Sequence, residues 1–289
     1  MTGVLLACVA GMAFGALTVA IRIALRRAPD PEVAPAITSA LACALAATAA
    51  AVAGDLADVD LDALWPFAAI GAVVPGLSQV VFVRAIRDAG PARAAVVLGV
   101  APLLSAVLAV AFLDESLSPA LALGTVLVVA GGAALAWERS RPVDFRLVGL
   151  GFALAAACLF AVRDNLVRAV ARSEDVPPLA ATTASLLGAS CALVVLVLVV
   201  RRRDALRAMA DAAVPFLPSA AILAIAYAAL LEAFDRGTVT VVAPLNATQS
   251  LWAVAFAAIF LGRSEAIGRR LVLAAVLIVA GSAIVAASR

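Results

Sequence analysis

Long apolar runs, separated by short polar breaks, follow one another along the whole chain. Ten runs can be read, at residues 3–25, 33–54, 64–84, 91–113, 117–137, 147–170, 177–200, 214–234, 238–261 and 267–287. Each is close to the roughly 20 apolar residues that a helix needs to cross a bilayer. The breaks carry arginine, aspartate, proline and glycine, which end a helix at a water boundary. The pattern therefore predicts ten transmembrane helices, and we expect the first to be a retained helix rather than a signal, because no basic segment precedes it.

Composition supports the same conclusion. Hydrophobic residues make up 65% of the 289 positions and charged residues 14%, whereas soluble domains are about 25% charged. In lipid each backbone polar group must be satisfied within its own segment, so the runs are expected to be helices. Ten spans leave only short connections and no room for a large soluble domain. The predicted fold class is an all-α integral membrane protein.

The second half of the chain repeats the first. Four short segments recur in order at an offset that drifts only from 146 to 150 residues: 31–39 with 177–185, 62–67 with 211–216, 112–116 with 260–264, and 129–132 with 279–282. This pattern predicts two five-helix repeats, at residues 1–140 and 141–289. An odd number of spans turns the second copy upside down, which is the inverted-repeat plan of many secondary transporters.

The end of each repeat carries motifs that resemble a known family. The first copy has Ala85-Ile86, Ala89, Ala94, Ala95, Pro102-Leu103, Phe112-Leu113-Asp114-Glu115, Gly124 and Gly131, and the second has Ala233-Phe234, Leu261-Gly262 and Gly281. In order and span they resemble the drug/metabolite transporter superfamily, in its ten-helix form with two EamA repeats, over nearly the whole chain. Ser250 and Arg263 depart from the pattern, in the slots of Pro102 and Glu115, and Phe14-Gly15 stands where the family often has Trp-Gly.

The resemblance implies a secondary transporter that moves a small metabolite, amino acid or drug-like compound across the cell membrane. Alternating access, coupled to protons or driven by exchange, is the implied mechanism. The alternative is a lipid-linked flippase or an accessory membrane protein on the same scaffold. The expected partners are a small-molecule substrate and membrane lipid, and a homodimer is one assembly that such a bundle allows. A fold does not specify a cargo.

Other classes of function find little support in the residues. The chain has no histidine, its 21 basic residues are all arginine, and its four cysteines lie inside apolar runs without CxxC spacing. It carries no nucleotide-binding loop. We therefore expect no enzyme, no cofactor and no metal site. The net charge of +2 does not indicate a nucleic-acid partner, and none is expected.

Arginine placement predicts an orientation. Two arginines lie within spans, Arg22 and Arg163, and four lie on the side of the even-numbered connections and the termini: Arg168, Arg172, Arg236 and Arg289. The remaining 15 lie on the side of the odd-numbered connections: Arg26, Arg27, Arg84, Arg87, Arg93, Arg139, Arg141, Arg146, Arg201, Arg202, Arg203, Arg207, Arg263, Arg269 and Arg270. The positive-inside rule then places the odd connections in the cytoplasm and both termini outside. Many members of the family are thought to have both termini inside, so the arginine bias points the other way.

Ionisable groups within a span cost about 2.5–3.5 kcal/mol on insertion scales, so each needs a reason. The densest group is Arg163, Asp164, Asn165 and Arg168, late in the sixth run. It is either a substrate or proton site, or a helix end whose arginines reach the headgroups. Arg22 occupies the matching slot of the first run, and the same two interpretations apply to it.

Polar residues that follow prolines are the other candidates for the substrate path, because a proline break often lines a cavity. They are Ser78, Gln79, Asn246, Gln249 and Ser250, together with Tyr227, the repeat equivalent of Gln79. The alternative is hydrogen bonding between helices, which polar residues supply in any bundle. Asp164 is the first candidate for a proton-carrying carboxylate and Glu232 the second, although Glu232 also suits a solvated helix end. Gly11 and Gly15 form a GxxxG step that predicts close helix packing.

Overall fold

The fold is helical throughout the described part of the chain. The computed structural model describes residues 2–57, 60–101, 103–104, 119–137, 144–170, 176–236, 242 and 245–287. Five segments in these ranges are long and apolar enough to cross a membrane: Thr2–Arg27, Val33–Ala53, Leu61–Ala89, Pro178–Arg201 and Ala205–Arg236. The predicted all-α membrane fold is therefore confirmed.

The helices follow the predicted order. The first half contains α1 (Thr2–Arg27), α2 (Val33–Ala53), α3 (Leu61–Gly71), a π-helical turn η1 (Ala72–Leu77), α4 (Ser78–Ala89), α5 (Pro91–Leu98) and α7 (Pro119–Ala136). The second half contains α8 (Val148–Val170), α9 (Pro178–Arg201), η2 (Arg202–Asp204), α10 (Ala205–Arg236), α12 (Gln249–Phe260), η3 (Gly262–Glu265) and α13 (Arg269–Ala287). The predicted boundary between repeats at residue 140 lies outside the described residues and stays a prediction.

Two spans differ from the expected helices. The third is broken, because Val74 leaves the helical region (φ −141°, ψ 112°) just before Pro75, and α3 and α4 meet at η1. The eighth is longer than its apolar run: α10 begins at Ala205 rather than near residue 214 and has 32 residues. Its first turns are rich in alanine, leucine, methionine and arginine, which favour helix even where the side chains face water.

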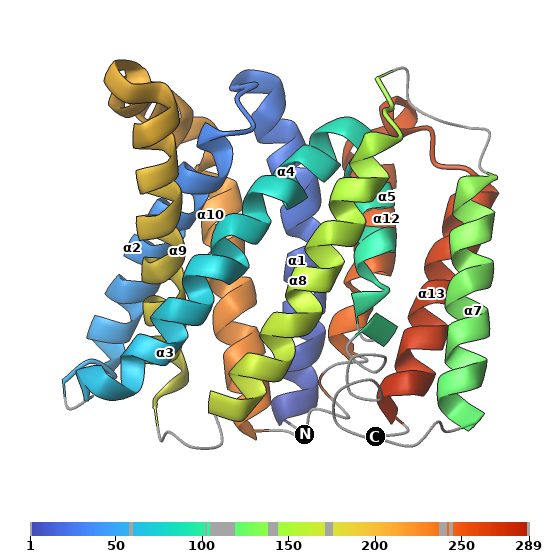
Figure 1. Cartoon of the computed structure of the whole chain (residues 1–289), viewed down its shortest axis with the longest axis horizontal. Helices are drawn as coiled ribbons and strands as arrows, with labels where there is room; N and C mark the ends of the chain where they lie inside the picture. Colours follow the sequence, from blue (N-terminus) through green and yellow to red (C-terminus); the bar gives the residue numbers. More distant parts are fainter. Residues whose placement is uncertain are drawn as a thin grey trace.

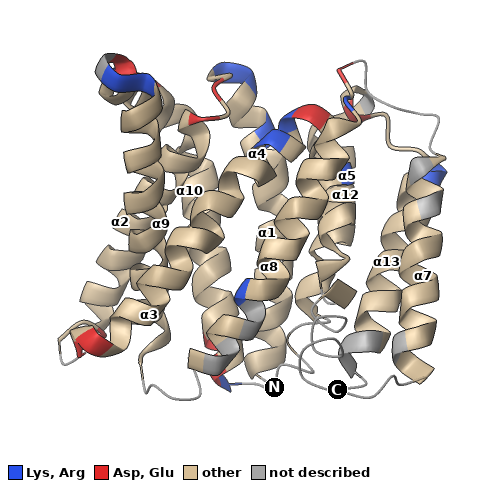
Figure 2. Ribbon diagram, viewed as in Figure 1, with Lys and Arg blue, Asp and Glu red and all other residues tan. Residues whose placement is uncertain are grey.

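The two ends of the bundle carry different charges. Both chain termini lie at one end, which we call the terminus end (Figure 1). Most basic residues lie at the opposite end (Figure 2), which we call the arginine-rich end. It includes the last turn of α1 and the turn η2 that follows α9. The odd-numbered connections therefore share one end, as the arginine tally requires.

Contacts between helices show how the two halves interlock. α1 packs on α10 and α12, and the second-half equivalent of α1, which is α8, packs on α4 and α5. α3 packs on α9 just as α10 packs on α2, while α2 meets its own equivalent α9 and α7 meets its own equivalent α13. The main contacts between the halves thus have symmetry-related partners in the described part of the chain, which is the arrangement of two inverted repeats.

Glycines permit several of these contacts. A Cβ added at Gly188 of α9 would lie 1.9 Å from the carbonyl oxygen of Ala68, and one at Gly71 of α3 would lie 2.0 Å from that of Ser185. A Cβ added at Gly15 of α1 would lie 2.6 Å from the Cβ of Trp252 of α12, which confirms the close packing predicted for the GxxxG step. Small residues let backbones approach in lipid, where no hydrophobic effect drives helices together.

Replacing Gly188 by alanine tests the crossing of α3 and α9. The added methyl group meets backbone rather than a flexible side chain, so we expect a loss of about 1–3 kcal/mol of stability, as in other overpacked cores. Thermal unfolding in detergent, followed by size-exclusion chromatography of heated samples, measures this loss. Gly151→Ala on α8 is the matched control, since nothing lies within 4 Å of the added Cβ. Equal melting temperatures for both variants would contradict the crossing.

Candidate substrate site and the junction at the arginine-rich end

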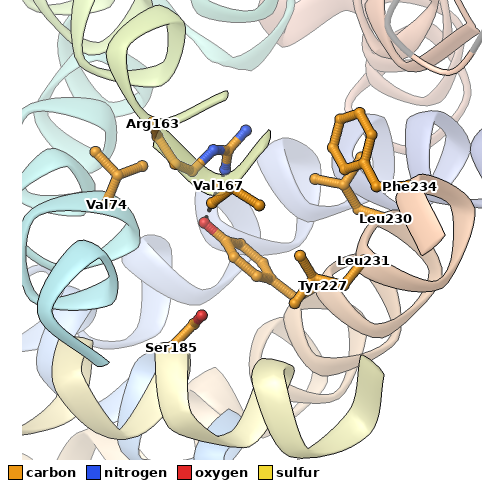
Figure 3. A pocket seen from close by; sticks show the side chains of 8 residues that line it. All are labelled: Val74, Arg163, Val167, Ser185, Tyr227, Leu230, Leu231 and Phe234. Carbon is orange, nitrogen blue, oxygen red and sulfur yellow. Dashed lines mark hydrogen bonds between the residues drawn. The ribbon is translucent and has the colours of Figure 1, made fainter. Parts of the chain in front are cut away.

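A small pocket lies between the two halves of the bundle. It is narrow, with room for about one water molecule. The residues that line it come from η1, α8, α9 and α10 (Figure 3): Val74, Arg163, Val167, Ser185, Tyr227, Leu230, Leu231 and Phe234. The wall is thus apolar apart from one guanidinium and two hydroxyl groups, a composition common in small-molecule sites.

Arg163 is the charged group of this pocket. Its side chain is buried, and one terminal nitrogen donates a hydrogen bond of 2.8 Å to the hydroxyl oxygen of Tyr227. The guanidinium carbon also lies 5.1 Å from the ring centre of Phe160 and 5.6 Å from that of Tyr227. Cation–π contacts of this kind are worth about 2 kcal/mol when desolvated. The arginine is therefore held inside the bundle rather than extended to the headgroups.

Several elements place these two side chains. Arg163 is the sixteenth residue of α8, about 22 Å along the helix from its start at the arginine-rich end. Tyr227 projects from α10 and meets the ring of Phe14 of α1 edge-on, with centroids 5.8 Å apart. The break at η1 brings Val74 to the same pocket. Both repeats thus contribute to the site, as expected of a carrier with inverted halves.

A second group of charged residues lies at the arginine-rich end. Arg22 of α1 donates a 2.8 Å hydrogen bond to the carbonyl oxygen of Arg87, and its Nε lies 3.4 Å from the carboxylate of Glu265. Arg93 of α5 is fully buried and donates to the backbone oxygens of Glu265 (2.9 Å) and Ala266 (3.4 Å). We call Arg22, Arg93 and Glu265 the junction, because they tie α1, α4 and α5 to η3.

Gly90 makes room for the junction. Its φ of +89° is one that glycine adopts readily, and it separates α4 from α5. A Cβ added there would lie 2.3 Å from Oε2 of Glu265. The carboxylate of Glu265 therefore packs directly against the backbone of Gly90.

Burial dominates the electrostatics of Glu265, which lies in η3 outside the spanning helices. Its side chain is wholly inaccessible, and neither carboxylate oxygen has a hydrogen-bond partner among the described residues. Loss of hydration raises the pKa of this carboxyl above its usual value, and the positive charges of Arg22, Arg93 and Arg26 offset this only in part.

Ser78, Gln79, Asn246, Gln249 and Ser250, which were also candidates for the substrate path, are not among the residues that line the Arg163 pocket. The Ser78 hydroxyl donates to the carbonyl oxygen of Pro75, and that of Ser250 donates to Ala95 across the repeats. Gln79 is buried, and its side-chain oxygen has no hydrogen-bond partner in the described part of the chain; the same is true of the Asn246 side-chain oxygen. Gln249 is half-buried at the start of α12.

The carboxylate candidates give less information. Asp164, Asn165 and Arg168 lie on α8, and their side chains fall outside what the structure describes. Glu232 forms an ion pair with Arg236 one turn further along α10. That pair is partly exposed and lies within one helix, as expected of a solvated helix end.

Sequence reasoning missed the junction. It counted Arg93 among the arginines of the connections and did not single out Glu265. One signal was present: the second copy has Leu261-Gly262 without a glutamate in the next position, and a glutamate follows at residue 265. Nothing in the pattern shows that this glutamate meets Arg22, which is 243 positions away in the chain.

Comparison with known proteins agrees with this architecture. The EamA-like transporter family matches residues 1–137 and again residues 147–287. One solved crystal structure, among 15 matching chains, superposes with a TM-score of 0.59; it is 19% identical, and the match covers 98% of this chain and 95% of the other. At that identity the likeness shows the fold alone. No match was found among curated proteins.

These observations define a multi-pass membrane transporter built from two inverted five-helix repeats. The chain belongs to the EamA-like transporter family, and it is a membrane transporter of the drug/metabolite type.

Tyr227→Phe tests the contact at the centre of the pocket. Loss of the hydroxyl leaves a buried guanidinium with one acceptor fewer, and hydrogen bonds to charged groups contribute about 1.5–3 kcal/mol. We expect a lower melting temperature in detergent. Thr48→Ala serves as the control, because its exposed hydroxyl bonds only to the Ala44 carbonyl of its own helix. An unchanged melting temperature for Tyr227→Phe would argue against the bond.

Proposed function

We propose that this protein is a secondary transporter that moves small organic solutes by alternating access, with the Arg163 pocket as its substrate site. The observation that supports this most is the buried guanidinium of Arg163, held against two aromatic rings in a pocket to which both repeats contribute. A cation inside a membrane protein is costly and is usually functional.

The chemistry of the pocket favours a cargo with two parts. A guanidinium recognises a carboxylate through charge-assisted hydrogen bonds. The side chains of Leu230, Leu231 and Phe234 favour an apolar group beside it. Amino acids and small organic acids combine these features. Either a proton gradient or exchange with a second solute would drive their transport. The narrow pocket is consistent with a closed conformation that widens when cargo enters.

The flippase alternative is less well supported. In that alternative, Arg22 and Arg168 would meet a lipid phosphate. Arg22 instead contacts Glu265 and the carbonyl oxygen of Arg87, and the side chain of Arg168 lies outside the described residues. A carrier of soluble compounds fits the charged pocket better. Lipid contacts around the bundle and assembly into a homodimer stay predictions.

Binding and flux test the proposal. Purified protein is screened by thermal shift against amino acids, organic acids, amines and neutral solutes, and the compounds that raise the melting temperature are then assayed for flux in proteoliposomes. We expect carboxylates with an apolar part to bind. Arg163→Gln should lower their affinity by at least about tenfold, because a charged hydrogen bond contributes roughly 1.5–3 kcal/mol.

Arg207→Gln, an exposed arginine of α10, is the control and should leave binding and flux unchanged. Absence of flux for every compound under every gradient would contradict a transporter. Full flux of a carboxylate in Arg163→Gln would contradict this site alone.

We also propose that the protein lies in the cell membrane with its arginine-rich end in the cytoplasm, following the positive-inside rule. In a background without the four native cysteines, Asp62→Cys at the terminus end should react with an impermeant maleimide added to intact cells. Arg27→Cys at the arginine-rich end should react only after permeabilisation. The reverse pattern would place the termini in the cytoplasm.

A further inference from the structure

The junction joins the two repeats at the arginine-rich end. Arg22, Arg87 and Arg93 belong to α1, α4 and α5 of the first repeat, whereas Glu265 belongs to η3 of the second. An outer ion-pair group, in which Arg201 of α9 meets Asp30 and Glu32, also links the repeats but is largely exposed. Exposed pairs are screened by water and contribute little, whereas the junction includes two charge-assisted hydrogen bonds from the buried Arg93.

Alternating access requires this end to open. If the two repeats move apart at this end, the ends of α1, α4 and α5 separate from η3, because they belong to different repeats. Arg93 resists that separation, because it is fully buried and donates to two backbone oxygens of the other repeat. Opening would expose the backbone oxygens of Glu265 and Ala266 and the guanidinium of Arg93 to water.

The Glu265 carboxylate makes closure sensitive to protonation. Both carboxylate oxygens are removed from water, and neither accepts a hydrogen bond from a described residue, although Oε1 lies 3.4 Å from Nε of Arg22. The loss of hydration favours the neutral acid over the anion. Among the described residues, the charged groups that face it are Arg22 and Arg26 of α1 and Arg93 of α5. At the end of α4, Asp88 forms an ion pair with Arg87. Helix α12, which packs on η3, has no ionisable residue.

We propose that the junction of Arg22, Arg93 and Glu265 is the gate of the arginine-rich end, and that closing it binds one proton on Glu265 from the water at that end. Opening returns the proton to the same water. This inference rests on the proposed alternating-access function and adds a proton site and its regulation to it.

The direction of the pH effect follows from linkage. Burial raises the pKa of Glu265 in the closed state, whereas in an open, hydrated gate the carboxyl has its ordinary value of about 4.5. The closed state therefore binds the proton more tightly, so acidification favours closure. Within the window between the two values, one proton changes the ratio of closed to open molecules by about tenfold per pH unit.

Distances between spin labels measure the gate without any cargo. Labels are placed at Arg27→Cys on α1 and Arg269→Cys on α13, two exposed sites on opposite repeats, in a chain whose four native cysteines are replaced. The distances are measured in nanodiscs by double electron–electron resonance, from pH 8 to pH 5. We expect the share of the short distance to rise as the pH falls.

Two variants should move the gate in opposite directions. Glu265→Gln mimics the protonated acid, so it should stay closed and lose the pH response. Arg93→Gln loses the bonds to the carbonyl oxygens of Glu265 and Ala266, so it should be more open at pH 8 and still close on acidification. Glu32→Gln is the matched control: it also faces an arginine of the other repeat but is exposed, and it should behave like the unmodified gate.

The outcomes separate the gate from the transport proposal. Identical distances at pH 8 and pH 5 in the unmodified chain would overturn the gate, as would opening on acidification or a full pH response in Glu265→Gln. The unmodified pH series decides the matter even if a junction variant fails to fold. Absence of flux beside an intact pH response would count against the transporter and leave the gate standing.

Discussion

The structure depends on the close approach of helices from different repeats. In lipid, apolar side chains gain nothing by leaving one apolar environment for another, so association rests on packing and on buried polar contacts. Here backbones meet at glycines: Gly71 and Gly188 form one crossing, and Gly131 and Gly281 let α7 and α13 approach each other. Because these crossings join the two repeats, each half is completed by the other.

This interlocking decides where charges can lie. Helix walls that face lipid or neighbouring backbones accept few ionisable groups, and most of the described ones lie at the two ends of the bundle (Figure 2). The two arginines that lie within the apolar runs of the sequence are accommodated differently. Arg163 is enclosed by aromatic rings and a tyrosine hydroxyl, whereas Arg22 lies beside a buried carboxylate. One thus suits a pocket for cargo, and the other suits a connection between moving parts.

Much of the fold could be predicted because spanning a bilayer leaves a strong signal in the sequence. Apolar runs of sufficient length predicted the helices, and recurrence at a nearly constant offset predicted the repeats. The misplaced start of α10 has a clear cause, since a helix can continue beyond the lipid where residues such as Ala205 and Leu206 favour it. The candidate site was less predictable: Arg163 and Tyr227 were both singled out, but their pairing across 64 positions was not.

The sequence by itself determined the class of the molecule, its repeats and the sign of charge at each end, because hydropathy and arginine placement are properties of segments. Only the tertiary structure decided which residues act together. It brought Arg163 to Tyr227, and it enclosed Glu265 between Arg22, Arg93 and the bare backbone of Gly90. Such contacts join residues far apart in the chain, so they depend on how the helices cross and not on any local pattern.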